Sequence, residues 1–200
     1  MLQSYQLFGS FVERVLEKME ITQKLEVAER AEWRQWLIDH HATASEIWLV
    51  SYDTASGRPR IPYLDTVEEA LCFGWIDGIA KRLDAQRTAQ RFTPRRPKSN
   101  WTELNKERAR RLIANGLMTE AGQAKLPDLS LEAFRISADI VAALQADPLV
   151  WENFQRFPAL YQRIRISYIE ETRKQPQVFQ QRLDNFLYKT RQNKMFGGME

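Results

Sequence analysis

The sequence predicts an α+β protein: a small antiparallel sheet with flanking helices, followed by an all-helical C-terminal part. β-Branched and aromatic runs bounded by Gly and Pro lie between about residues 46 and 94. Before and after that stretch, apolar residues recur at helical spacing. With 44% apolar and 11% aromatic residues among 200, the chain has enough apolar side chains for a packed core and is not typical of a disordered protein.

The N-terminal part is expected to be helical. Apolar residues at spacings of three and four predict a first helix over residues 8–19. A second helix is predicted over about residues 26–40, with Trp33, Trp36 and Leu37 on its inner face.

The central part is expected to hold the sheet. Residues 46–52 are predicted to form a strand, and residues 75–83 and 89–93 a hairpin with a loop over 84–88. Between them, residues 65–73 predict a short helix. Thr66 and Glu69 are interpreted as the capping box of that helix, and Gly74 as its end.

The remaining elements are helices. One is predicted from about residue 99 to Asn115, with Gly116 as its stop, and another along the apolar face of residues 131–144. Proline suits the first position of a helix, so Pro148, Pro158 and Pro176 are expected to begin three more. We expect an N-terminal helix at 1–28, an α+β core at 29–125 and a helical region at 126–200 that packs on the core.

The basic charge is concentrated in one block. Residues 79–111 contain 11 Lys or Arg and 3 Asp or Glu, a net charge of +8, although the whole chain is only +3. Such a block can attract anions, unless acidic groups elsewhere in the fold neutralise it. Both interpretations stay open from the sequence.

The sequence also indicates where in the cell the protein is expected. No apolar stretch is long enough for a membrane span, and residues 1–10 do not resemble a signal peptide. The single cysteine, Cys72, has no partner for an internal disulfide. We therefore expect a cytoplasmic protein with no membrane span, and the sequence does not fix its oligomeric state.

The basic loop after the hairpin is the strongest candidate site. Cationic side chains alternate there with aromatic and small polar residues ahead of a predicted helix start, where backbone N–H groups favour anions. Arginine adds paired donors for phosphate or carboxylate, and indole rings can stack on a base. The candidate ligand-binding residues of this loop are Trp75, Arg91, Phe92, Arg95, Arg96, Lys98, Ser99 and Trp101. The alternative is a solvated hairpin that only fixes the entry of the helix.

The next helix adds two polar candidates. Asn105 and Arg108 fall inside its apolar sector, where polar groups need partners. Asp77 is a carboxylate available to Arg108. A buried structural Asp–Arg–Asn network is favoured over a catalytic role for these three residues.

Other chemistries have little support. His40 and His41 are adjacent and no third ligand has suitable spacing, so no metal site is expected. Cys72 lies between Leu71 and Phe73 and is interpreted as a small buried residue. Glu68 and Glu69 are interpreted as helix-surface charge. The sequence lacks a phosphate-cradling glycine loop, a GxSxG motif and a zinc pattern, so no cofactor is expected.

Several motifs carry a family resemblance. They lie at residues 32–37, 47–49, 68–78, 91–101, 105–108 and 116–122. In these residues, within about 29–125, the sequence resembles the YdeI/OmpD-associated family of bacteriocin-protection proteins. Residues 169–174 resemble the family more loosely. The resemblance implies stress resistance through protection against bacteriocins or antimicrobial peptides, and it implies no particular catalytic residue.

Three functions remain open. The favoured one is a cytoplasmic binding protein whose anionic small molecule or phosphate meets the face over residues 91–101. The second is an enzyme of unknown reaction on a phosphorylated or carboxylated metabolite, with Asp77, Arg95 and Arg108 as candidates. The third, less favoured, is nucleic-acid binding, which needs the basic block and Arg182, Lys189, Arg191 and Lys194 on one continuous face.

Overall fold

A computed structural model describes residues 20–198 of the chain. These residues form two compact units, one of residues 20–97 and 117–125 and the other of residues 98–116 and 126–198. The first unit holds a sheet with helices and the second is helical, so the predicted α+β class is confirmed. The helix predicted over residues 8–19 lies outside the described residues.

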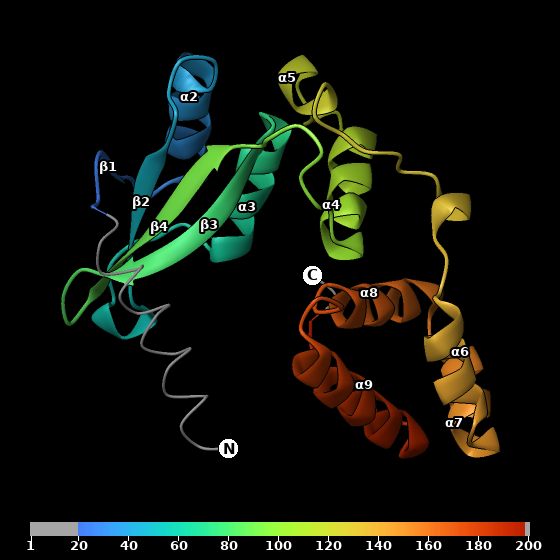
Figure 1. Ribbon diagram of the computed structural model, residues 1–200. Helices are drawn as coiled ribbons and strands as arrows, with labels where there is room; N and C mark the ends of the chain where they lie inside the picture. Colours follow the sequence, from blue (N-terminus) through green and yellow to red (C-terminus); the bar gives the residue numbers. More distant parts are fainter. Residues whose placement is uncertain (1–19, 199–200) are drawn as a thin grey trace. The chain divides into compact units, whose positions relative to one another are not determined.

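A four-stranded sheet in the order β1-β2-β4-β3 organises the first unit (Figure 1). β1 (Lys24–Glu26) runs parallel to β2 (Ile47–Tyr52), and β4 (Arg87–Pro94) is antiparallel to both β2 and β3 (Trp75–Arg82). The predicted hairpin is confirmed. Its loop is shorter than expected, because β4 already pairs with β2 from Arg87 onward. The sequence does not predict β1, since three residues are too few to show an alternating pattern.

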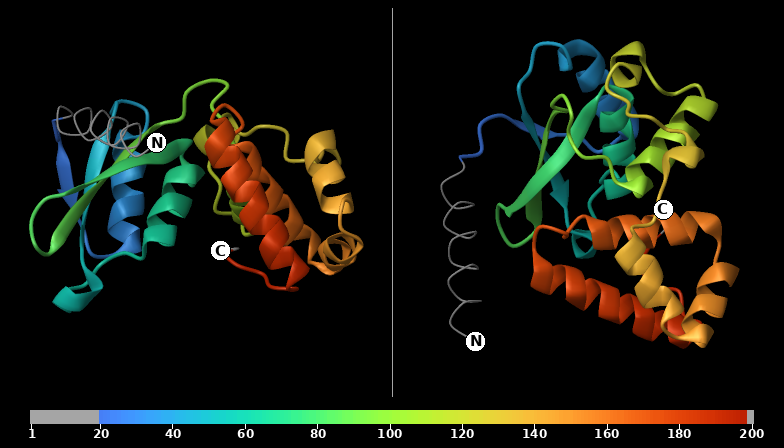
Figure 2. Two further views of the ribbon diagram at one scale, coloured as in Figure 1. Left: turned by 60° about the horizontal axis from the view of Figure 1, so that its bottom comes forward. Right: turned by 45° about the vertical axis from the view of Figure 1, so that its right-hand side comes forward.

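One face of the sheet carries α2 (Arg30–His40) and α3 (Tyr63–Cys72), which lie on the same side in the left view of Figure 2. Ile47 and Phe92 are opposite each other in the strand register and both are fully buried. The Trp33 ring lies 5.3 Å from the Phe92 ring, and its Nε1 donates a hydrogen bond to the Thr66 carbonyl at 3.0 Å. Thus the predicted inner face of α2 is confirmed.

The helix starts differ from the sequence prediction. α2 begins at Arg30, four residues later than expected, after an N-cap at Glu29. α3 begins at Tyr63, so Thr66 lies inside the helix and its hydroxyl donates to the Tyr63 carbonyl at 2.6 Å. The predicted capping box of Thr66 and Glu69 is therefore wrong. Gly74, with φ of 73°, ends α3 as predicted.

Two short elements complete the first unit: η1 (Thr54–Ser56) after β2, and α5 (Glu120–Gln123). α5 is attached to the end of α3. The backbone N–H of Thr119 donates to the Cys72 carbonyl at 3.1 Å, and the Thr119 hydroxyl donates to the same oxygen at 2.5 Å. Gly122 lies so close to that carbonyl that an added Cβ would come within 2.3 Å of its oxygen.

The second unit contains α4 (Glu103–Ala114), η2 (Leu131–Ala133), α6 (Ala138–Gln145), α7 (Pro148–Arg156), α8 (Ala159–Glu170) and α9 (Pro176–Arg191). The three predicted helices are present: two begin at Pro148 and Pro176, and the third begins at Ala159, directly after Pro158. The helix expected from residue 131 begins only at Ala138, because a 3₁₀ turn and an extended Phe134 precede it.

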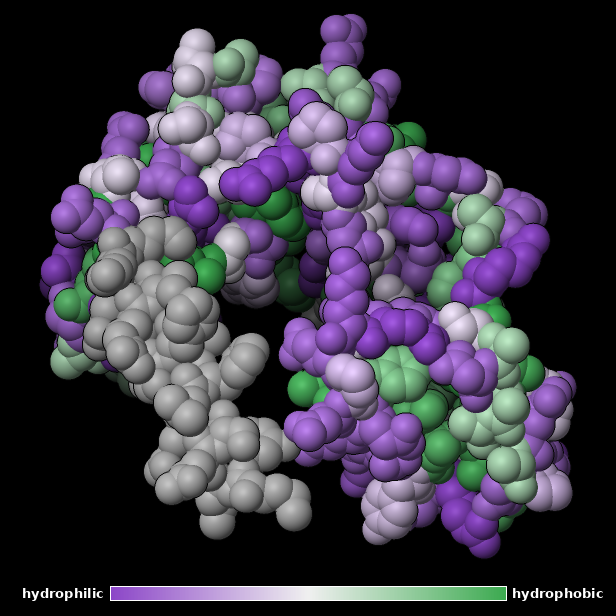
Figure 3. All heavy atoms as spheres, viewed as in Figure 1, coloured by the Kyte–Doolittle hydropathy of each residue, from purple (hydrophilic) through white to green (hydrophobic). Residues whose placement is uncertain are grey.

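The C-terminal helices have their own core. Fully or almost fully buried side chains from four helices meet there, among them Ile140, Phe154, Tyr161, Ile166 and Phe186. Figure 3 shows apolar side chains at the surface of this unit among hydrophilic ones. Exposed apolar side chains include Leu149, Tyr168, Tyr188 and Met195. None of the helices in the described part of the chain is both long and apolar enough to cross a membrane.

Candidate functional site

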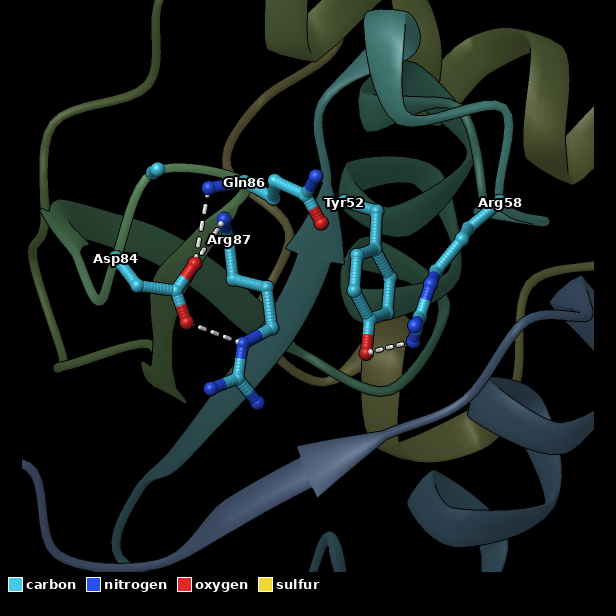
Figure 4. Close-up of a pocket in the computed structure, with 6 residues that line it drawn as sticks. Tyr52, Arg58, Asp84, Gln86 and Arg87 are labelled. Atoms are coloured by element: carbon cyan, nitrogen blue, oxygen red, sulfur yellow. Dashed lines mark hydrogen bonds and ion pairs between the residues drawn. The ribbon is translucent and has the colours of Figure 1, made fainter.

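A pocket of about 390 Å³ lies in the first unit, where β2 ends and the β3–β4 hairpin turns (Figure 4). Its lining residues come from the end of β2, the loop after η1, and the hairpin loop with the start of β4: Tyr52, Arg58, Asp84, Ala85, Gln86 and Arg87. The pocket is shallow and open to solvent over much of its boundary.

Tyr52 and Arg58 form one wall. The Arg58 guanidinium lies 4.7 Å from the centre of the Tyr52 ring, and its Nη1 donates a hydrogen bond to the Tyr52 hydroxyl at 3.0 Å. The Tyr52 hydroxyl in turn donates to the Glu26 carboxylate at 2.5 Å. These contacts fix the arginine beside the ring, so its charge stays at the pocket.

Arg87 and Asp84 form the opposite wall. Tyr52 and Arg87 are opposite each other in the register of β2 and β4. One Asp84 oxygen accepts the backbone N–H groups of Gln86 and Arg87, both at 2.9 Å, and the other accepts from Arg87 Nε at 2.7 Å. The bond from Gln86, followed by the Arg87 side chain, lowers the pKa of Asp84, so this carboxylate stays charged and holds Arg87 in place.

The pocket keeps donors for a ligand. A guanidinium has five N–H donors, and the hydrogen bonds among the described residues use one from Arg58 and one from Arg87. A weaker ion pair joins Arg87 to Glu26 at 3.8 Å. Figure 4 shows the Gln86 side chain extending toward the Tyr52 ring. The arrangement can present several N–H groups to an oxyanion.

Two aromatic candidates of the predicted basic-loop site are buried and not exposed to a ligand. Trp75 and Phe92 belong to the core, with exposed fractions of 1% and 0%. Trp75 Nε1 donates to the His41 carbonyl at 3.1 Å, and its ring packs edge-on against Trp36. Neither ring has an exposed face, so the expectation that Trp75 stacks on a bound base is wrong.

Arg91 is neutralised within the fold. Its guanidinium holds the Glu46 carboxylate through Nε at 2.7 Å and through Nη2. Arg82, Arg87, Lys106 and Arg110 also have carboxylate partners. Much of the +8 block is therefore paired with acidic side chains of the same protein.

Arg95 is also unsuited to an open site, because only 3% of it is exposed. Burial lowers its pKa to about 10, and the nearby Asp77 partly offsets that effect. Arg96 and Lys98 are exposed, with Lys98 in the left-handed backbone region at φ of 59°. Of these two exposed cations, Arg96 belongs to the first unit and Lys98 to the second.

In the second unit, the start of α4 already has internal partners. The Glu103 N–H donates to Ser167 Oγ at 3.1 Å, and the Asn105 N–H donates to the Thr102 hydroxyl at 3.1 Å. The Glu103 side chain is 4% exposed and lies 2.8 Å from Lys106 and 3.6 Å from Arg163. The first turn of α4 therefore already holds a buried carboxylate of the chain itself, which is surrounded by the chain's own cations. Ser99 and Trp101, just before α4, are partly buried.

The network predicted around Arg108 is confirmed in part. Arg108 is buried, and its Nη1 donates to the Asn105 side-chain oxygen at 2.8 Å. Asp77 belongs to the first unit, where the Tyr63 hydroxyl donates to it at 2.5 Å. The proposed Asp77–Arg108 pair would join the two units and stays a prediction.

Comparison with protein families covers both parts of the chain. Residues 25–125 match the family model described as Domain of unknown function (DUF8412), just over half of the chain. The chain belongs to the DUF8412 family. Residues 133–193 match the model described as Bacteriocin-protection, YdeI or OmpD-Associated. Comparisons with curated proteins and with solved structures gave no significant match.

The second match supports the predicted resemblance to the YdeI/OmpD-associated family, but over α6–α9 and not over residues 29–125. Most motifs that suggested the resemblance instead lie in the DUF8412 region. That region also contains the whole pocket. Sequence reasoning missed Tyr52, Arg58 and Arg87, since it interpreted their segments as a strand end and loops. An aromatic residue ending a strand, with an arginine in the loop that follows, is the signal that could have found them.

Proposed function

We propose that this protein binds a small anionic molecule, a phosphate or a carboxylate, in the pocket around Tyr52, and that this binding serves protection against bacteriocins. One observation carries the proposal: Arg58 and Arg87, from separate segments, flank the Tyr52 ring in a pocket of about 390 Å³. The description of the family matched by residues 133–193 supports the biological role.

The proposed ligand is anionic, as expected from the sequence, but its site is the pocket around Tyr52 and not the loop over residues 91–101. In the basic loop, Arg91 is ion-paired and Arg95 is buried. At the pocket, Arg58 is exposed, and Arg87 is partly exposed with its Nε on the Asp84 carboxylate. Both guanidiniums are held in position by neighbours, which reduces the entropy lost on binding.

The two alternatives have less support. In the helical unit, Arg182 donates to the Tyr168 carbonyl and Arg191 pairs with Asp147, so cations needed for a nucleic-acid face are engaged internally. The enzyme hypothesis relied on Asp77, Arg95 and Arg108, and none of the three lines the pocket.

The test is a thermal-shift titration with inorganic phosphate and with acetate, using wild type and the double variant Arg58→Ala/Arg87→Ala. A ligand that binds only the folded state raises Tm, so we expect a saturable rise in wild type that is lost in the double variant. Arg156→Ala is the matched control, since Arg156 is an exposed arginine on α7 whose ion pair is with Glu152.

A third variant, Arg96→Ala, separates the pocket from the basic loop. Retention of the Tm rise in Arg96→Ala supports the pocket. Loss in Arg96→Ala with retention in the double variant would move the site to the loop, and no rise with either anion would overturn the proposal. Far-UV circular dichroism confirms that each variant is folded.

A further inference from the structure

A buried arginine in the second unit lies beneath the segment that follows α9. Arg165, on α8, is only 9% exposed. Its Nη2 donates a long hydrogen bond to the Gly198 carbonyl at 3.5 Å, and its Nε has no hydrogen-bond partner. Within residues 20–198, the nearby carboxylate is Glu171, which forms its ion pair with Arg182, at 3.9 Å, and none with Arg165. A guanidinium buried without a paired counter-charge is costly, so this position is suited to receive an anion.

Aromatic rings surround the Arg165 guanidinium. Its central carbon lies 5.9 Å from the ring centre of Tyr161, 5.3 Å from that of Tyr168 and 5.5 Å from that of Phe196. Cation–π attraction to these rings partly offsets the missing counter-charge. A second guanidinium, that of Arg182, lies 3.6 Å from the centre of the Tyr168 ring. The surroundings thus suit an anion that also carries an apolar group.

The cover over Arg165 is a short segment, residues 195–198, which we call the strap. After α9 the chain turns back toward α8 (Figure 2), and within the strap only Phe196 is partly buried, while the other three residues are exposed. The Phe196 N–H donates to the Tyr161 hydroxyl at 3.2 Å, and the Phe196 ring packs on the core, 6.4 Å from the ring of Phe186. Displacement of the strap would therefore open an apolar slot directly beside a buried cation.

We propose that the strap covers a second binding site, whose ligand is an aromatic carboxylate. The ring of the ligand takes the place of Phe196, and its carboxylate accepts two N–H groups of Arg165, including the Nε that now has no partner. The site is formed by residues of the second unit alone, so this inference goes beyond the proposed function and does not rest on it. Because the ligand binds only molecules with a displaced strap, its affinity falls with the fraction of molecules that are closed.

Two glycines of the strap provide a matched pair of variants. A Cβ on Gly197 would lie 2.3 Å from Arg165 Nη1, and the φ of 73° at Gly197 disfavours other residues. Because rings enclose the guanidinium, we expect Gly197→Ala to move the exposed strap. A Cβ on Gly198 would have no atom within 4 Å, so Gly198→Ala is the control. Phe196→Ala is a second opened variant, since it empties the slot.

The experiment is isothermal titration calorimetry of the full-length protein with 3-phenylpropanoate and with its uncharged analogue 3-phenylpropan-1-ol. All variants are made in the Arg58→Ala/Arg87→Ala background, so that the pocket around Tyr52 does not contribute to the signal. Far-UV circular dichroism checks that each variant is folded, and the two opened variants keep the test decisive if one of them fails to fold.

Both opened variants are expected to bind 3-phenylpropanoate about tenfold or more tightly than Gly198→Ala and the unchanged strap, because more of their molecules are open. The alcohol is expected to bind Gly197→Ala about tenfold or more weakly than the carboxylate, since it cannot form the charged pair. Adding Arg165→Met, which keeps an unbranched apolar side chain, should abolish that difference.

Three results would overturn the proposal: no binding of the carboxylate to either opened variant, equal binding of the carboxylate and the alcohol, or equal affinity of the opened variants and Gly198→Ala. A difference between carboxylate and alcohol that survives Arg165→Met would overturn it as well. The proposed function of the pocket around Tyr52 is judged separately, because its test compares phosphate binding by wild type and by Arg58→Ala/Arg87→Ala.

Discussion

The Glu69 carboxylate and the Arg34 guanidinium form a partly buried ion pair between α3 and α2, with Oε2 and Nη1 2.6 Å apart. The other Glu69 oxygen lies 2.6 Å from Arg30 Nε, and only 3% of Glu69 is exposed. The interpretation of Glu69 as helix-surface charge is therefore wrong. This carboxylate joins the two helices that cover the sheet.

We predict that Glu69→Gln lowers the free energy of unfolding by about 1.5–3 kcal/mol, since it removes charge-assisted hydrogen bonds from two partly exposed arginines. Glu68→Gln, the neighbouring control, is expected to lose under about 1 kcal/mol, because the Glu68 contact with Arg30 is longer, at 3.6 Å. Urea denaturation measures both. Equal losses would show that Glu69 is only a surface charge.

The pairing of Glu46 with Arg91 predicts a pH dependence. A hydrogen bond from the Thr22 hydroxyl and then the Arg91 guanidinium lower the pKa of Glu46 below its ordinary 4.5. The unfolded chain then binds the proton more tightly than the folded one. The stabilisation is therefore complete above about pH 5 and disappears as the pH falls through the folded pKa.

We expect Glu46→Gln to lose about 1–2 kcal/mol at pH 7, and the difference from wild type to shrink steadily below pH 4.5. Tm values of both proteins at pH 7, 5 and 3.5 provide the measurement. Glu152→Gln, which removes an exposed pair on α7, serves as the control and should show little difference at any of these pH values. A Glu46→Gln deficit that is the same at pH 3.5 and pH 7 would contradict the assignment.

Cys72 is predicted to be unreactive in the folded protein. Burial, and secondly the charge of Glu69, raise the pKa of its thiol to about 11. At pH 8 the thiolate fraction is then roughly a thousandth, and the sulfur has no access to solvent. We expect labelling by a disulfide reagent to be at least about 100-fold slower than in urea-unfolded protein. Similar rates in both states would reopen a nucleophilic role for Cys72.

The sequence predicts best what local chemistry decides. Gly74 ends α3, the hairpin forms, and three prolines mark three helix starts, because each depends on residues within a few positions. What it misses depends on distant partners. The sequence presents Arg91 as a candidate cation for a ligand, but β2–β4 pairing brings it to Glu46, 45 residues away. Likewise, Arg163, one of the cations beside the buried Glu103 carboxylate, comes from a helix much later in the sequence, α8.

The candidate pocket is missed for the same reason. Its residues come from separate segments that only the sheet register brings together, with Tyr52 opposite Arg87. Composition and charge still indicate an anionic ligand, since the cations are abundant in the sequence. Composition and charge cannot show which of those cations are buried or paired with carboxylates of the same chain.

The close approach of α5 to α3 gives the last prediction. A Cβ on Gly122 would lie 2.3 Å from the Cys72 carbonyl oxygen and 2.5 Å from the Met118 sulfur, so Gly122→Ala must push α5 away from α3. We expect a loss of about 1–3 kcal/mol or more in the free energy of unfolding, measured in urea. Gly78→Ala is the control, because the nearest atom to its added Cβ is at an ordinary 3.7 Å. If both variants unfold at the wild-type urea concentration, the contact between α5 and Cys72 does not stabilise the fold, and the motif at residues 116–122 needs another explanation.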